Sequence, residues 1–251
     1  RELGNRIVRV EPAEGVENGY IYLGTSRTDL RAYRGTIRLI LEGKNLLAVN
    51  NVPLEEYLLG VVSAEMNPDW PAEALRTQAV ASRSYALFNL DRYDGRGFDV
   101  ADDHRSQMYG GVDVETDPTT AAVVDTTNMV VKYEDKLAVV VFHYDSGGKT
   151  ASNLDLWPSS GEIPYLAGVE DAMGLTNFSV GSSYESWSSR ASFTTLRDAL
   201  NLDGETFVGD YLSSITILSE SEDGRVQTID LIGEKNPVVR AMTFISVLNR
   251  R

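Results

Sequence analysis

The chain has 251 residues, 42% of them hydrophobic and 24% charged, which suits one large domain or two small ones with an apolar core. Its formal net charge of −14 argues against general nucleic-acid binding, because that function needs a basic surface. The chain has no cysteine, which excludes disulfides, thiol nucleophiles and cysteine-ligated metals.

The first fifty residues predict β-strands. Apolar or alternating runs occupy residues 20–23, 33–41 and 46–49. A Glu-Gly-Lys sequence at 42–44 predicts the hairpin turn between the last two runs.

Residues 51–90 predict two helices joined by an Asn-Pro-Asp-Trp-Pro turn, with Pro71 as the first residue of the second helix. One face of the first helix follows the i, i+3, i+4 spacing and consists of Leu54, Tyr57, Leu58, Val61, Val62 and Glu65. An acid on such a stripe either pairs with a cation or holds a proton, and a general acid needs the second state. Glu65 is therefore a candidate catalytic residue, and the alternative is one half of a structural ion pair.

The middle of the chain predicts one helix and one hairpin. Residues 98–111 predict an ordered loop and 119–127 a helix. Residues 129–133 and 137–143 predict a hairpin with a Glu-Asp turn.

The last hundred residues predict a long loop, a short helix and a second hairpin. Residues 146–165 are rich in Gly, Ser and Pro, and long loops of this kind are usually functional or mobile. Residues 194–200 predict a helix that begins with a Thr cap, and 215–218 with 226–232 predict the hairpin.

Strands before, between and after a central helix pair predict an α+β fold. We expect antiparallel hairpins and sheets around the two helices, with a long substrate-binding cleft. A single domain over 1–251 is expected, as one body or as two lobes. In the two-lobe arrangement 1–50 and 165–251 are mainly strands, and 51–164 carry the helix pair and the catalytic cleft.

Two arginines of the second helix are candidate substrate-binding residues. Arg76 and Arg83 are seven residues apart and therefore lie on nearly one face. Arg83 stands in an apolar stretch, where a guanidinium needs a carboxylate or a sugar hydroxyl as its partner. It could orient Glu65, although such a salt bridge counts against a neutral acid. For Arg76 the alternative is a solvated side chain or a local ion pair.

The sequence FHYDSGGKT at 142–150 is the second candidate site. Gly147 and Gly148 permit positive φ and a close backbone approach to a ligand. The predicted substrate-binding residues of this segment are His143, Tyr144, Ser146, Gly147, Gly148, Lys149 and Thr150, whose hydroxyl and ammonium donors suit a sugar or a lactyl carboxylate. The alternative is a simple turn at the end of a strand, and the GxxxxGK[ST] spacing of a phosphate loop is lacking.

Metal binding is the weaker hypothesis. Asp102, Asp103 and His104 could form an N/O site. We expect no metal and no cofactor.

The sequence PLEEYLLGVVSAEMNPDWPAEALRTQAVASRSYAL, from Pro53 to Leu87, resembles the core motif of the SpoIID/LytB family. Three further blocks resemble that family in the expected order: SQMYGG at 106–111, FHYDSGGKTASNLDLWPSSGEIPYLAGVED at 142–171 and GRVQTIDLIG at 224–233. The usual EMP of the family is EMN here, with proline displaced by one place to Pro68, which puts details of substrate fit in doubt.

The resemblance implies a lytic transglycosylase that cleaves the MurNAc-GlcNAc glycan strands of peptidoglycan to 1,6-anhydro-muramyl products, with Glu65 as the acid/base. This is the leading hypothesis, and its chief rival is a non-catalytic, amidase-enhancer-type module that binds glycan or a cell-wall amidase. A third hypothesis is a two-carboxylate glycoside hydrolase in which Asp145 or Asp99 assists Glu65. An extracytoplasmic protein is expected, either secreted, periplasmic or anchored through a segment absent from this chain.

Overall fold

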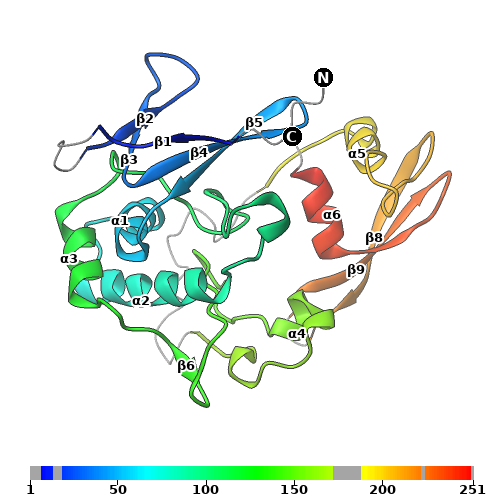
Figure 1. The fold of residues 1–251 in the computed structure, drawn as a ribbon. Helices are drawn as coiled ribbons and strands as arrows, with labels where there is room; N and C mark the ends of the chain where they lie inside the picture. The colour runs from blue at the N-terminus through cyan, green and yellow to red at the C-terminus, as the bar shows by residue number, and fades with distance from the viewer. Residues whose placement is uncertain (1–6, 14–18, 172–187, 222–223, 250–251) are drawn as a thin grey trace. The chain divides into compact units, whose positions relative to one another are not determined.

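The computed structural model describes residues 7–13, 19–171, 188–221 and 224–249. Figure 1 shows the helices and strands of these residues as a ribbon. The chain divides into two units, Arg1–Phe142 and His143–Arg251, and each unit has its own hydrophobic core. Within these described ranges, none of the helices combines the length and the apolar character that a bilayer span requires.

The first unit begins with five short or medium strands. They are β1 (Val8–Val10), β2 (Ile21–Leu23), β3 (Arg31–Tyr33), β4 (Thr36–Glu42) and β5 (Asn45–Asn51). Strands β4 and β5 form the predicted hairpin, with Glu42 opposite Asn45 and Gly43 at φ 63° in the turn. Strand β1 adds to the other edge of β4, giving the antiparallel order β1-β4-β5, while β2 pairs with β3. Strands β1 and β3 escape the sequence pattern because three residues carry too little periodicity to register.

Two helices follow as predicted: α1 (Leu54–Glu65) and α2 (Ala72–Phe88). The apolar stripe of α1 forms the centre of the core, with Leu58, Val61 and Val62 fully buried. Pro71 is the N-cap of α2 rather than its first helical residue, because its ψ of 138° is extended. This correction shifts the helix start by one position.

Helix α3 (Asp117–Asp125) packs against both α1 and α2. Before it, a short 3₁₀ turn, η1 (Asp94–Arg96), lies in the loop after α2. After it, β6 (Lys132–Tyr133) and β7 (Lys136–Leu137) form a hairpin with positive φ at both turn residues. The predicted hairpin is correct in its turn and too long in its arms, since the apolar residues 138–142 form no strand.

The second unit combines short helices with an antiparallel sheet of order β10-β9-β8. Its elements are α4 (Asn153–Leu156), η2 (Pro158–Ser160), η3 (Pro164–Leu166), α5 (Phe193–Leu200), β8 (Leu212–Glu220), β9 (Val226–Gly233), β10 (Val238–Arg240) and α6 (Ala241–Leu248). The predicted β8–β9 hairpin is present, although turn residues 222–223 lie outside the described part. The α5 cap is Ser192, whose hydroxyl accepts from the Thr195 amide, and not the predicted Thr194.

The described chain is thus an α+β protein with small antiparallel sheets, as predicted. Its second core joins Leu200 of α5, Leu231 of β9 and Val247 of α6, all nearly or fully buried. Strand β10 and helix α6 are additions that the sequence reading does not contain.

Candidate functional site

Glu65 is the last residue of α1 and is half-buried. Its Oε1 accepts a hydrogen bond of 2.7 Å from the backbone amide of Met108. No arginine or lysine of the described residues forms an ion pair with it. Of the two states predicted for an acid on this stripe, the cation-paired one is therefore not adopted.

The loop that carries Met108 is fixed on α1 by a close backbone approach. The Gly110 amide donates to the carbonyl of Gly60 at 3.3 Å. A Cβ on Gly60 would stand 2.7 Å from the Tyr109 ring and 2.8 Å from the Gly111 oxygen. Glycine at position 60 thus lets the loop approach the helix closely enough for Met108 to approach Glu65.

Three tyrosines, Tyr33, Tyr57 and Tyr109, form a layer next to the loop that carries Met108. The Tyr57 and Tyr109 rings lie 5.0 Å apart, and Tyr33 lies 6.0 Å from Tyr109. The Tyr57 hydroxyl donates to Gln107 at 3.3 Å, and the Tyr109 hydroxyl to Asn50 at 2.8 Å. Burial raises the pKa of Tyr57 and the pKa of Tyr109, and the charge of Glu65 adds to the rise at Tyr57.

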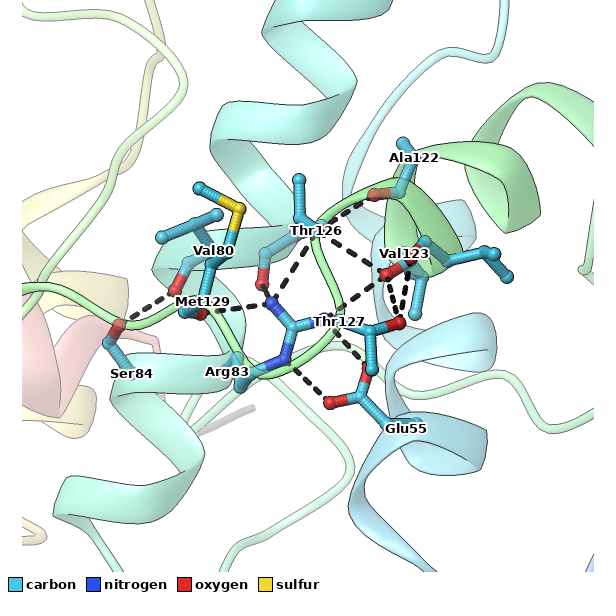
Figure 2. Close-up of polar contacts among 11 residues, drawn as sticks. Glu55, Val80, Arg83, Ser84, Ala122, Val123, Thr126, Thr127 and Met129 are labelled. Carbon is cyan, nitrogen blue, oxygen red and sulfur yellow. Dashed lines mark hydrogen bonds and ion pairs between the residues drawn. The ribbon is translucent and has the colours of Figure 1, made fainter.

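Arg83 lies in the core and pairs with Glu55, not with Glu65 (Figure 2). Its side chain is 1% exposed. Its remaining hydrogen bonds go to the carbonyls of Ala79, Val123 and Met129 and to the Thr126 hydroxyl, so that it joins α1, α2 and the end of α3. The hypothesis that Arg83 orients Glu65 is therefore corrected: its partner belongs to the opposite end of α1. In this arrangement Arg83 offers no surface to a ligand.

Arg76 lies on the surface and is also paired. Its guanidinium contacts Asp125 at 2.7 Å and Glu73 within its own helix. The side chain is 36% exposed, so one edge is open to solvent. This is the local ion pair named as the alternative above, and binding of substrate by Arg76 stays a prediction.

The segment 143–150 belongs to the second unit. Gly147 and Gly148 both have positive φ, of 68° and 97°. Arg225 of the β8–β9 hairpin donates to the carbonyls of Ser146 and Lys149, which fixes the turn. His143 and Tyr144 are exposed, with Tyr144 at 72%.

The C-terminal end of segment 143–150 is held by an antiparallel β-bridge between Lys149 and Glu170. The Thr150 amide donates to the Val169 carbonyl at 2.9 Å, and Lys149 lies 3.9 Å from Glu170. Ser146, Lys149 and Thr150 are half-buried. The Ser146 hydroxyl accepts from the Gly148 amide, and the Thr150 hydroxyl accepts from the Val169 amide. Contact of this segment with glycan stays a prediction.

Asp102, Asp103 and His104 do not form a metal-binding cluster. Asp103 pairs with Arg105 at 2.9 Å, which holds the pKa of Asp103 below its usual range, and His104 is exposed. Over the described part of the chain, no group of three or more His, Cys, Asp or Glu side chains is arranged to hold a metal ion.

A cavity of about 820 Å³ lies in the first unit. One wall is formed by β4 and β5, and the other by residues 94–102. Asp99 and Asp102 line this cavity and Glu65 does not, so the cavity is distinct from the cleft predicted at Glu65.

Residues 42–133 match the model of the SpoIID family, described as stage II sporulation protein. The chain is 35% identical over 171 residues to the amidase enhancer of Bacillus subtilis, a match that covers 62% of this chain and 23% of the relative. It is 33% identical over 138 residues to the stage II sporulation protein D of Bacillus amyloliquefaciens, covering 49% of this chain and 40% of the relative. These similarities support a relation of the chain to the SpoIID/LytB type of protein.

The SpoIID match covers α1, α2 and α3 and includes Glu65, Arg76 and Arg83. The chain is also 29% identical over 200 residues to an uncharacterized protein of Brachyspira hyodysenteriae, a match that covers 79% of this chain and 52% of that protein. The chain spans about half the length of this relative and less of the two Bacillus relatives.

Three contacts at the candidate site could not be predicted from the sequence. Glu55 is the partner of Arg83, the Met108 amide is the donor to Glu65, and Gln107 is the acceptor of the Tyr57 hydroxyl. Each joins residues 28 to 50 positions apart. The SQMYGG block marked the segment of Met108 and Gln107, but it did not indicate which atom would meet Glu65.

Proposed function

We propose that this chain acts on the cell wall as a lytic transglycosylase that cleaves MurNAc-GlcNAc strands of peptidoglycan, with Glu65 as the acid/base. The observation that carries the proposal is the state of Glu65. It is half-buried, forms no ion pair with the described residues, and has one oxygen held by a backbone amide. The site of action implies an extracytoplasmic location for the protein.

The proposed reaction needs one carboxyl group. Glu65 gives its proton to the glycosidic oxygen as the bond from that oxygen to muramyl C1 breaks. The C6 hydroxyl of the same muramyl residue then bonds to C1, and the Glu65 carboxylate accepts the hydroxyl proton. The product is a 1,6-anhydro sugar, the enzyme regains its starting state, and no water is consumed.

The Met108 amide gives the two oxygens of Glu65 different roles. Because an N–H can only donate, Oε1 acts as the acceptor, and the proton of the neutral acid resides on Oε2. As the proton leaves, charge develops on the carboxylate and the amide hydrogen bond strengthens. An interaction that is stronger in the transition state than before it accelerates the reaction.

In this proposal the two arginines act differently. Arg83 acts through the fold, because it lies beneath the surface in the pair with Glu55. Arg76, with its exposed edge, is the proposed contact to the sugar in the first unit. The turn at 146–150 is proposed separately to contact glycan in the second unit.

The rival function is a cell-wall binding module that assists an amidase. It is favoured by the 35% identity to a protein named amidase enhancer. In that case the surface around Glu65 would bind glycan or an amidase, and no glycan would be cleaved.

The deciding experiment is mass spectrometry of products from purified, peptide-free glycan strands, with the wild type compared to Glu65→Gln. Anhydro-muramyl ends from the wild type alone support the lytic reaction. Reducing ends would instead indicate hydrolysis with a second carboxylate. Strands that both proteins bind and leave intact would favour the binding module.

The matched control is Glu56→Gln. Glu56 lies on the same helix as Glu65, so the substitution makes the same chemical change at the other end of α1. It is expected to leave the products unchanged.

A further inference from the structure

Gln107 is a buried polar side chain, and the stability of the fold does not explain why this residue is a glutamine. It is fully buried, and its Nε2 has no hydrogen-bond partner among the described residues. Only its Oε1 is engaged, by the Tyr57 hydroxyl at 3.3 Å. An apolar side chain of similar size would avoid the loss of solvation at Nε2, so a glutamine here calls for another reason.

That reason lies in its neighbour. Gln107 and Met108 are consecutive, and each is bonded to α1: Gln107 to Tyr57, and Met108 to Glu65. Tyr57 and Glu65 are eight residues apart, about two helical turns. Two successive residues of one loop are therefore tied to two points on the same helix, which limits how the intervening peptide can rotate.

We propose that Gln107 is a positioning residue: bonded to Tyr57, it holds the Met108 amide as the donor to Glu65 Oε1. This inference rests on the proposed function for its catalytic consequence, but the geometric part stands apart from it. Gln107 itself touches neither substrate nor the reacting atoms, since its side chain is buried.

The arrangement has a defined effect on the reaction. The amide hydrogen bond stabilises the charged carboxylate more than the neutral acid. Release of the loop therefore raises the free energy of the transition state, in which this charge develops. It leaves substrate binding nearly unchanged.

The test variant is the double substitution Tyr57→Phe with Gln107→Met. It replaces both hydrogen-bonding partners by apolar groups of similar shape, a change that is nearly neutral for stability. On peptide-free glycan strands we expect kcat to fall about tenfold and KM to stay constant.

The matched control is Tyr109→Phe. It removes a hydroxyl with the same burial from the same tyrosine layer, but one bonded to Asn50. Its kcat and KM are expected to match the wild type. If the double variant does not fold, Tyr57→Phe alone, which removes a single hydroxyl, takes its place and is expected to lower kcat in the same way while KM stays constant.

A second readout needs no activity. The chemical shift of the Met108 amide proton is expected to differ between the wild type and Glu65→Gln, because the substitution replaces its carboxyl acceptor. Introduced into the double variant, Glu65→Gln is expected to change this shift less. A change as large as in the wild-type background, or an equal reduction in Tyr109→Phe, overturns the inference. A wild type that leaves strands intact overturns the proposed function alone, since the amide shift still tests Gln107.

Discussion

Arg83 and Glu55 form a bidentate ion pair that joins α2 to the first turn of α1, with N–O distances of 2.8 and 2.7 Å (Figure 2). The arginine is 1% exposed and the glutamate 35%. Arg83 also bonds the Val123 carbonyl in the last turn of α3, where a positive charge is favourable. One buried cation thus connects the three helices that carry the candidate site.

Removal of this cation should destabilise the first unit. Arg83→Met is expected to lower the free energy of unfolding by about 3 kcal/mol, because the carbonyls around it lose their donor and Glu55 loses its partner. The measurement is chemical denaturation at neutral pH. Arg76→Met is the matched control in the same helix, and its ion pair is solvent-exposed, so we expect a much smaller loss of unfolding free energy. Equal losses in the two variants would contradict the structural role of Arg83.

The close approach at Gly60 gives a second prediction. Gly60→Ala places a Cβ 2.7 Å from the Tyr109 ring and 2.8 Å from a backbone oxygen, which cannot move without the loop. We expect a loss of about 2 kcal/mol in unfolding free energy. The Met108 amide shift should also lose its response to Glu65→Gln. In Gly95→Ala the added Cβ meets nothing within 4 Å and φ is not positive, so little change is expected; a similar loss there would refute the steric explanation.

Alkaline pH should weaken the tyrosine layer. Burial raises the pKa of Tyr57 and Tyr109 above the ordinary value of 10.0. Above that pH the unfolded chain releases protons that the folded chain retains, so stability is complete below about pH 10 and falls as pH rises further. Denaturation series at increasing pH measure this slope. Tyr57→Phe and Tyr109→Phe should each make it shallower, whereas Tyr133→Phe, at a 39% exposed position, should leave it as it is.

The turn at 146–149 should depend on Arg225. Its guanidinium donates to the carbonyls of Ser146 and Lys149, so Arg225→Ala is expected to expose this turn to proteolysis. Limited digestion followed by mass spectrometry locates the new cut. Arg240→Ala is the matched control in the same unit, because it removes bonds to the carbonyls of Asp155 and Leu156 instead. New cleavage at 146–149 in both variants would mean that Arg225 has no specific role there.

The sequence by itself determined the elements that local patterns encode. The 3.6-residue periodicity placed α1 and the face on which Glu65 lies, and the Gly-containing turn placed the β4–β5 hairpin. Both signals arise within a few residues, because backbone hydrogen bonds of helices and hairpins connect near neighbours. Strand β10 shows the limit of such local patterns, because a three-residue strand has too few positions to display a period.

Only the tertiary structure decided the partners. The acid that meets Arg83 is 28 residues away, and the amide that meets Glu65 is 43 residues away. Several carboxylates on α1 carry the same charge, so the sequence gives no reason to prefer Glu55 to Glu65. The choice depends on how α1 packs against α2 and on the space that Gly60 leaves for the loop, which are properties of the assembled core rather than of any local segment.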